Sequence, residues 1–433
     1  MASQHSDELG PFKRSSGKTD PPIVHRIVSQ HVEEASFLWL LRHVAISRPN
    51  YFLGDLVKLD NRIESHLHGL RIAGQGGWNL ILESLDCDEP CDLFPAAFLA
   101  FDSGRRDWID FLFGHLVKRP ELAAGIISAL GWLPYDQAKS HLESLTASDQ
   151  SAFRAIGIGA FAIHRVDPGR ILNDAIADDN AAVRARALRA VGELGRIDLL
   201  PRMRGMHSDP DDGARFAAAW SETLLSPNLD SLSVLRTFAE SPGPFAGKAM
   251  QTTVRRMDLA AAKAWQAWFS RRRNGMRSAI AAAGTIGDQE LVLWLIRQMN
   301  VPIHARPAGE AFSLITGVDL AYEHLDKSAP DGFEAGPTDD PADENVAMDP
   351  DEYLPWPDPA LIQKWWTRNQ SRFQRGTRYL LGKPMSVEWL REVLRDGRQR
   401  QRAAAALELA IRQPGQPLFE VRAPGFRQQA SLK

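Results

Sequence analysis

The stretch Asp178–Arg196, DDNAAVRARALRAVGELGR, decides the fold because its apolar residues recur at three- and four-residue steps. This spacing places one set of side chains on a single helix face: Val183, Ala187, Leu188, Val191 and Leu194. Asp178 and Asn180 suit the turn before this helix, and Gly195 suits its C-terminal end. The stretch therefore predicts an amphipathic helix with its own start and stop signals.

The same unit recurs along the chain. A shorter amphipathic helix, ILNDAIADD, precedes the first one, so the unit is a pair of helices joined by a tight turn. Asp178 and Arg184 are echoed thirty-one residues later by Asp209 and Arg215. Related small-residue helices are AAGIISALGWL (123–133), RAIGIGAFAIHR (154–165), MRSAIAAAGTIGD (276–288) and RQRAAAALELAIRQPG (400–415). Such self-similarity predicts stacked helical repeats with almost no strands, and 400–415 is interpreted as a last copy.

The repeat unit resembles the short HEAT-like repeats of phycobilin lyases. The whole chain resembles a proteobacterial family of HEAT-like-repeat proteins that has no assigned activity. Three stretches carry this second resemblance: Gln30–Leu80, which begins QHVEEASFLWLLRHVAI, Ala308–Leu320 (AGEAFSLITGVDL) and Gly415–Gln429 (GQPLFEVRAPGFRQQ). The resemblance implies an all-α fold, a HEAT-like α-solenoid. Some members of that family are encoded near type VI secretion genes, which indicates a setting but no mechanism.

These observations divide the chain into five predicted parts. Residues 1–22 are polar and are expected to form a disordered leader, and residues 23–110 an N-terminal helical cap. Residues 111–320 are the predicted repeat array. Residues 321–360 are interpreted as an acidic, proline-rich linker or insertion, and residues 361–433 as a basic C-terminal helical segment.

The 433-residue chain has 44% hydrophobic and 24% charged residues, values typical of a soluble protein with a core. No apolar run approaches the ~20 residues of a membrane-spanning helix, and the polar start does not resemble a secretory signal. The only cysteines, Cys87 and Cys91, lack the further ligands of a closed zinc site, although the pair leaves a metal or regulatory disulfide open. We expect a cytoplasmic, reduced protein without a cofactor or a metal.

The net charge of −3 conceals an uneven distribution of charge. Residues 328–358 hold ten acidic residues, six prolines and no Lys or Arg. Such a stretch buries too little apolar surface to order itself, which is why a linker is predicted. Residues 360–433 hold fifteen Lys or Arg and five acids. This basic segment could contact nucleic acid, an acidic protein or the acidic linker itself.

The glycine-rich stretch His68–Leu80, HGLRIAGQGGWNL, raises the question of a phosphate-binding loop. A phosphate loop follows a strand, whereas the residues before Gly69 have helical spacing. The glycines are therefore interpreted as the end of one helix and its close crossing with the next. No other motif of nucleotide binding, zinc proteases, serine hydrolases or kinases fits the sequence.

Candidate partner-binding residues follow from the geometry of the repeat. The resemblance to HEAT-like arrays implies that Arg184 and Arg215 are structural, because such residues form a ladder of hydrogen bonds between the turns of adjacent units in those arrays. On the other side of the same inner helix, Arg186, Arg189 and Glu193 are predicted to contact a partner. Trp220 in the next repeat either extends this surface or lies in the core.

A second candidate surface lies in VRRMDLAAAKAWQAWFSRRRNGMR, Val254–Arg277. Arg271, Arg272 and Arg273 stand near Trp265 and Trp268, a combination that suits protein hot spots and nucleic-acid backbones. The alternative is a repeat with core tryptophans and solvated arginines. The segment 362–384, with two further tryptophans, has the same ambiguity.

Histidines are frequent near the N-terminus, but their spacing argues against a metal site. His66 and His68 point to different sides of a helix. His31 and Glu34, one turn apart, could chelate a metal or act as acid and base, but an exposed helical pair is favoured.

A curved stack of helix pairs has a long concave surface and no preformed catalytic pocket. The prediction is a non-catalytic protein-binding module, which in a secretion setting would act as an adaptor or an immunity protein. Two alternatives stay open. One is a nucleic-acid-binding protein of the DNA-binding or base-excision type, which needs the arginines to share one surface. The other is a lyase-like enzyme, which needs a deep polar pocket with a convergent acid or base.

Overall fold

The computed structural model of the chain describes residues 23–85, 89–337 and 348–432, so the predicted leader lies outside the described residues. Within these ranges the chain forms 21 α-helices and only two pairs of two-residue strands, which confirms the all-α prediction.

The first half of the chain contains α1 (His25–Ala45), α2 (Leu53–Ser84), α3 (Pro90–Ser103), α4 (Arg106–Lys118), η1 (Pro120–Leu122), α5 (Ala123–Trp132), α6 (Tyr135–Thr146), α7 (Ser151–His164), α8 (Arg170–Ala175), α9 (Ala181–Leu194), η2 (Ile197–Leu199), α10 (Leu200–Met203), η3 (Arg204–Ser208) and α11 (Asp212–Leu225).

The second half contains α12 (Leu229–Glu240), α13 (Ala246–Arg256), α14 (Leu259–Ser270), α15 (Met276–Ile286), η4 (Gln289–Leu291), α16 (Val292–Gln298), α17 (Pro302–Thr316), β1 (Asp326–Lys327), β2 (Trp356–Pro357), α18 (Pro359–Asn369), η5 (Gln370–Arg372), β3 (Tyr379–Leu380), β4 (Lys383–Pro384), α19 (Val387–Asp396), α20 (Gln399–Arg412) and α21 (Gly425–Ser431). β1 pairs antiparallel with β2, and β3 with β4.

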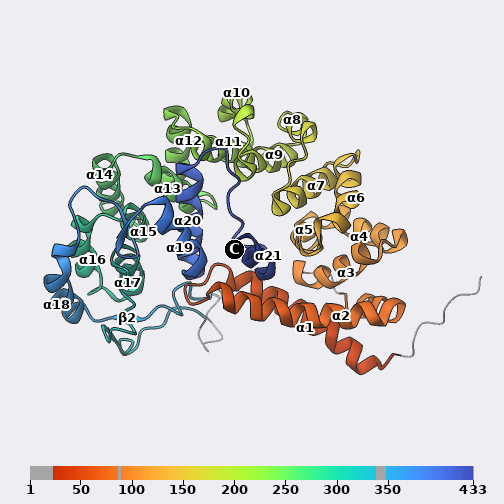
Figure 1. The fold of residues 1–433 in the computed structure, drawn as a ribbon, viewed down its shortest axis with the longest axis horizontal. Coiled ribbons are helices and arrows are strands. Elements are labelled where there is room, and N and C mark those ends of the chain that lie inside the picture. Colours follow the sequence, from red (N-terminus) through yellow and green to blue (C-terminus); the bar gives the residue numbers. More distant parts are fainter. Residues whose placement is uncertain (1–22, 86–88, 338–347, 433) are drawn as a thin grey trace, which may run out of the picture.

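The helices form two layers that curve around the molecule. The odd-numbered helices from α3 to α17 each contact the next odd-numbered helix, and Figure 1 shows them as the inner layer of an arc. The intervening even-numbered helices lie on the outside of the arc (Figure 1). Buried apolar side chains continue from the cap through the last helix pair, because each pair covers the exposed face of its neighbour.

Helix α9 illustrates how the sequence produces this arrangement. The side chain of Asn180 accepts hydrogen bonds from the backbone N–H groups of Ala182 and Val183, and Gly195 ends the helix with φ 72°. A Cβ atom on Gly192 would lie 2.8 Å from the Cα atom of Ser221 in α11. The glycine therefore permits the close approach of the two inner helices.

The glycine-rich stretch 68–80 lies within α2 and contains a joint. Gly74 has φ 52° and ψ −122°, a conformation outside the helical region, so α2 is two helical segments joined by a kink. A Cβ atom on Gly69 would lie 2.5 Å from the ring of His31, which places α1 in close contact at this point. These glycines allow a change of direction and a close helix crossing.

The C-terminal segment does not extend the stack, contrary to the interpretation of residues 400–415 as a last copy. Helix α20 packs on α19 and on the inner helices α11 and α13. Figure 1 shows α19, α20 and α21 in the middle of the arc, with the C-terminus near its centre. The Ala-rich face resembles a repeat because it also packs closely on helices, but besides the neighbouring α19 its partners α11 and α13 are distant in sequence.

The acidic stretch is not a free linker over its described residues. Asp351 is 4% exposed, and its carboxylate binds the guanidinium of Arg277 at 2.7 and 2.8 Å. Asp349 pairs with Arg306, whose guanidinium also stacks 4.6 Å from the ring of Trp356. Ion pairs with the array thus order a stretch that buries little apolar surface. The amino-acid composition of the stretch does not reveal these pairs. Residues 338–347 lie outside the described ranges.

Candidate functional site

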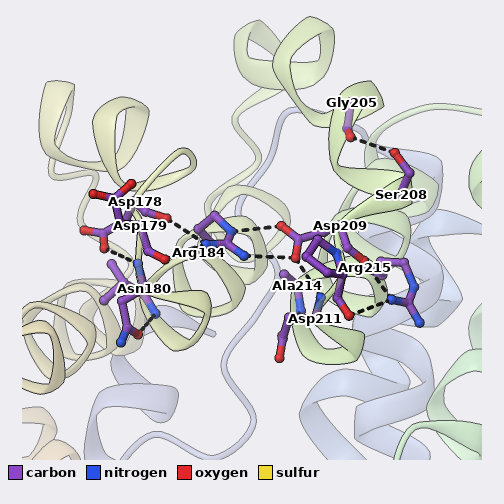
Figure 2. A network of polar contacts seen from close by, with 12 residues as sticks. Asp178, Asp179, Asn180, Arg184, Gly205, Ser208, Asp209, Asp211, Ala214 and Arg215 are labelled. Atoms are coloured by element: carbon purple, nitrogen blue, oxygen red, sulfur yellow. Dashed lines mark hydrogen bonds and ion pairs between the residues drawn. The ribbon is translucent and has the colours of Figure 1, made fainter.

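A ladder of arginine–aspartate pairs joins the turns of adjacent repeats (Figure 2). The Arg154 guanidinium binds Asp178 at 3.0 Å, and the Arg184 guanidinium binds Asp209 at 2.8 and 3.0 Å. Arg184 and Arg215 each also donate to two backbone carbonyls of their own turn. The predicted contact between adjacent units is therefore confirmed for Arg184, whereas the hydrogen bonds and the ion pair that the structure describes for Arg215 stay within its own turn.

The inner surface of the arc holds the C-terminal segment of the same chain. Leu418 donates its backbone N–H to the carbonyl oxygen of Glu193 at the end of α9. The Arg165 guanidinium donates to the carbonyl oxygen of Leu418 and pairs with the carboxylate of Glu420 at 3.0 Å. These contacts use the backbone of an extended segment, as in the binding of a peptide.

The N-terminal cap binds the same segment from the opposite side. Arg42 in α1 pairs with Asp60 in α2, and its guanidinium also donates to the carbonyl oxygens of Arg422 and Ala423. The carboxylate of Asp60 accepts the backbone N–H of Gly425. Because Arg42 is 8% exposed and Asp60 1% exposed, the C-terminal segment closes the arc through a buried charge pair.

Two neighbouring cavities remain on the inner surface, one on each side of this segment. The first, of about 260 Å³, lies between α1 and the inner repeat helices, and its lining includes Trp39, His43 and Arg186. The second, of about 250 Å³, lies towards α11, α13 and α20, and its lining includes Trp220 and Lys248. The two cavities share one wall made of Arg189, Glu193, Glu420 and Arg422.

Glu193 connects the two arginines that the sequence singled out. Its carboxylate pairs with Arg186 at 2.7 Å and with Arg189 at 2.8 Å. Burial opposes ionisation of Glu193, but Arg186, Arg189 and Arg165 outweigh it and lower its pKa to about 2. At 5% exposure Glu193 holds the arginines in place and is not part of the open surface on which it was predicted.

Arginines of the cavity walls influence the titratable groups beside them. Burial together with the charges of Arg422 and Arg42 lowers the pKa of His43. Burial together with Arg189 and Arg422 lowers the pKa of Lys248. Burial is the largest cause of both shifts, and the neighbouring arginines add to it, although Glu193 opposes the shift of Lys248.

The remaining predicted site residues do not share this surface. Trp220 is 8% exposed, packs in the core and contributes one edge to the second cavity, which is the core alternative for this residue. Arg271, Arg272 and Arg273 are exposed in the connection between α14 and α15. The Arg272 guanidinium stacks 4.4 Å from the ring of Trp268. None of the three arginines lines either cavity.

Cys91 and the N-terminal histidines were the other candidates from the sequence. Burial, followed by Asp92, raises the pKa of the Cys91 thiol to about 11, and Cys87 lies outside the described residues. The Nδ1 atoms of His31 and His66 lie 3.0 Å apart, a pairing across two helices that helical spacing did not predict. Within the described ranges no group of three or more His, Cys, Asp or Glu could hold a metal ion.

Sequence reasoning missed the residues of the cap and the C-terminal segment that complete the site. Arg42, His43 and Arg422 lie within Gln30–Leu80 and Gly415–Gln429, the two stretches that carry much of the family resemblance. The sequence signals that marked these stretches were the expected family resemblance and, for Arg422, the basic charge of residues 360–433. Local periodicity could not show that they meet.

Neither a protein-family model nor a curated protein matches the chain. Among the described residues no helix has the length and apolar character that a membrane crossing requires.

Proposed function

We propose that this protein is a non-catalytic protein-binding scaffold whose partner surface lies outside the inner cavities. The concave surface, where a stacked-helix protein usually binds its partner, already holds the C-terminal segment. The cavities of about 260 and 250 Å³ accommodate a small molecule at most. A stable protein interface needs roughly 800 Å² on each partner, which supports a binding surface elsewhere.

The observation that carries this proposal is the exposed arginine cluster at Arg271–Arg273 beside Trp268. These side chains are not tied into the ladder or the cavity walls, and Trp268 is only half-buried. Arginine and tryptophan are enriched among the residues that dominate protein interfaces. The chemistry of the cluster suits a partner with an acidic surface.

The inner cavities give little support to the lyase-like alternative. Glu193 is the buried acid of the shared wall, and with a pKa of about 2 it holds no proton at neutral pH and is a weak base. Its two carboxylate oxygens are bound to Arg186 and Arg189. This arrangement favours a structural or ligand-binding role over acid–base chemistry.

The nucleic-acid alternative requires the predicted arginines to share one basic surface. Arg186 and Arg189 line an inner cavity, whereas Arg271–Arg273 lie between two later helices and line no cavity. Because these two groups of arginines are separate, they fit a confined basic cluster better than a continuous basic surface that binds the phosphates of a nucleic acid. We therefore favour protein over nucleic acid.

Affinity capture with the full chain, followed by mass spectrometry, tests the proposal. We expect a reproducible protein partner that survives nuclease treatment and is lost when Arg271→Glu, Arg272→Glu and Arg273→Glu are combined. The control, Arg189→Gln with Arg422→Gln, changes the same type of side chain inside the cavities and should retain the partner. Recovery of nucleic acid alone, removed by nuclease, would support the alternative. An unchanged partner in the triple variant would contradict the proposed surface.

The setting of this function rests on the family resemblance alone. In a type VI secretion system the partner would be a secreted effector or a component of the secretion machinery. The scaffold would then act as an adaptor or an immunity protein in the cytoplasm. Reciprocal capture with the identified partner would distinguish these two roles, since an immunity protein must also suppress the toxicity of its effector.

A further inference from the structure

The inner cavities have a charge balance that their own side chains do not satisfy. Arg42 is neutralised by Asp60, and Arg165 by Glu420. Glu193 alone serves both Arg186 and Arg189, so one positive charge of this trio remains. With Arg165 set against Glu420, the charged groups around the first cavity therefore sum to one positive charge before Arg422 is counted.

Two cationic groups of the first cavity, Arg186 and Arg422, are incompletely paired among the described residues. The Nη1 atom of Arg186 is buried and has no hydrogen-bond partner among the described residues. Arg422 is exposed at the shared wall, and within the described ranges its guanidinium forms no ion pair within 4.0 Å. A buried donor without a partner is destabilising unless a ligand or water accepts from it.

The backbone around these arginines leaves space for a ligand. Gly131 and Gly159 form part of the first cavity's lining, together with Ala124 and Ser128. A Cβ atom on Gly159 would lie 3.3 Å from the Nε atom of Arg186. A larger residue at position 159 would therefore press on the guanidinium. The small side chains keep the cationic wall accessible from inside the cavity.

We propose that this cavity binds a small phosphate-bearing ligand, with its phosphate between Arg189 and Arg422 and within reach of Arg186. Planar guanidinium groups bind phosphate oxygens in pairs, and several of them can share one multivalent anion. The volume of about 260 Å³ limits the ligand to the size of inorganic phosphate, pyrophosphate or a mononucleotide. This site is separate from the proposed partner surface.

The bound phosphate would join parts of the chain that are distant in sequence. Arg189 belongs to the repeat array and Arg422 to the C-terminal segment, while His43 of the cap lines the same cavity. A ligand that contacts the array and the C-terminal segment favours the closed arc over any state in which that segment is released. Binding should therefore raise the thermal stability of the whole chain.

Calorimetric titration of the full chain with inorganic phosphate, pyrophosphate and adenosine monophosphate tests this site. We expect saturable binding of at least one of these anions at low salt, with a rise in melting temperature and weaker binding as salt increases. Tighter binding of the nucleotide than of pyrophosphate would identify a nucleotide ligand, and the reverse order a free phosphate species. Both outcomes support the site.

Matched variants locate the binding within the molecule. Arg189→Gln with Arg422→Gln should weaken the affinity by about tenfold or more, since each side chain loses a charge-assisted hydrogen bond. Arg271→Gln with Arg272→Gln removes the same charge outside the cavity and should leave the affinity unchanged. Circular dichroism and the melting temperature of the free variants establish that both remain folded.

Three results would overturn the proposal. The first is the absence of binding by all three anions at millimolar concentration. The second is equal weakening by the cavity pair and by the control pair, which would indicate attraction to net charge alone. The third is full affinity in the folded cavity variant. Partner capture does not depend on these measurements, so failure of one proposal leaves the other testable.

Discussion

Arginine side chains have three different roles in this molecule, set by what lies within reach of each guanidinium. Arg184 reaches an aspartate of the next repeat and two carbonyls of its own turn, so it fixes the stacking of two units. Arg42 reaches carbonyls of the C-terminal segment. Among the described residues, Arg186 donates to Glu193 and keeps one donor without a partner. The residue type alone does not distinguish these roles.

Replacement of Glu193 by glutamine should lower the free energy of unfolding by about 3 kcal/mol at neutral pH, because Arg186 and Arg189 lose their shared counter-charge. The folded-state pKa of Glu193 is lowered to about 2, so its contribution is present above the unfolded-state pKa and is lost as the pH falls through about 2. Urea unfolding of wild type and Glu193→Gln between neutral and acid pH measures both effects.

The free energy of unfolding of Glu193→Gln should therefore differ most from that of wild type at neutral pH and least in strong acid. Glu352→Gln is a suitable control because Glu352 is an exposed acid of the acidic stretch. It should change stability by less than about 0.5 kcal/mol. An equal difference between wild type and Glu193→Gln at every pH would contradict the assignment of a strongly lowered pKa.

At the scale of the elements, the glycines that end inner helices also mark where the C-terminal segment passes. Gly195 ends α9, Gly287 ends α15 and Gly317 ends α17, each with positive φ. Their nearest neighbours are backbone atoms of residues 415–416, 379 and 381–382 respectively. Because glycine has no side chain, another backbone segment can pack directly against each of these helix ends.

Gly195→Ala tests this double role. A Cβ atom there would be strained by φ 72° and would lie 2.8 Å from the carbonyl oxygen of Gln416. Gly104→Ala is the matched control, since Gly104 ends α3 with φ 67° and its Cβ would meet nothing within 4 Å. Backbone strain should destabilise the control by about 1 kcal/mol.

Thermal or urea unfolding should show a larger loss for Gly195→Ala, by at least about 1 kcal/mol beyond the control, because the contact with the C-terminal segment must also shift. Equal losses in the two variants would mean that this segment moves away without cost. The close packing of the segment on α9 would then be wrong.

At the scale of the whole molecule, the chain closes its own arc. The cap, the array and the C-terminal segment meet around buried charges, and the acidic stretch adds contacts at the far edge through Asp349 and Asp351. A stack of helix pairs is normally open along its concave side. Here the two cavities found on the inner surface of the described residues are small, which supports the proposal that a large partner binds elsewhere.

Asp60→Asn tests the closure. Asp60 pairs with Arg42 and accepts from the backbone of Gly425, so the variant leaves Arg42 buried without its counter-charge. We expect a loss of about 3 kcal/mol and faster hydrogen exchange in residues 414–432. Peptides from the ladder, such as residues 178–196, should exchange at the wild-type rate.

Asp319→Asn is the control for this measurement, because Asp319 forms a more exposed pair with Arg398 of the C-terminal segment. It should leave exchange in residues 414–432 close to wild type. Uniformly faster exchange across the chain in Asp60→Asn would indicate that the arc has no separate closing step.

The sequence by itself predicted the helices and their pairing within residues 111–320, because these features depend on residues within about one repeat of each other, while the ladder was implied by the resemblance to HEAT-like arrays. The tertiary structure alone decided that the concave surface is filled, that Glu193 is buried between two arginines and that the acidic stretch binds the array. These features depend on contacts such as that of Arg42 with Ala423, which are 381 residues apart. A local pattern records which face of a helix is apolar, but it does not record which distant segment covers that face.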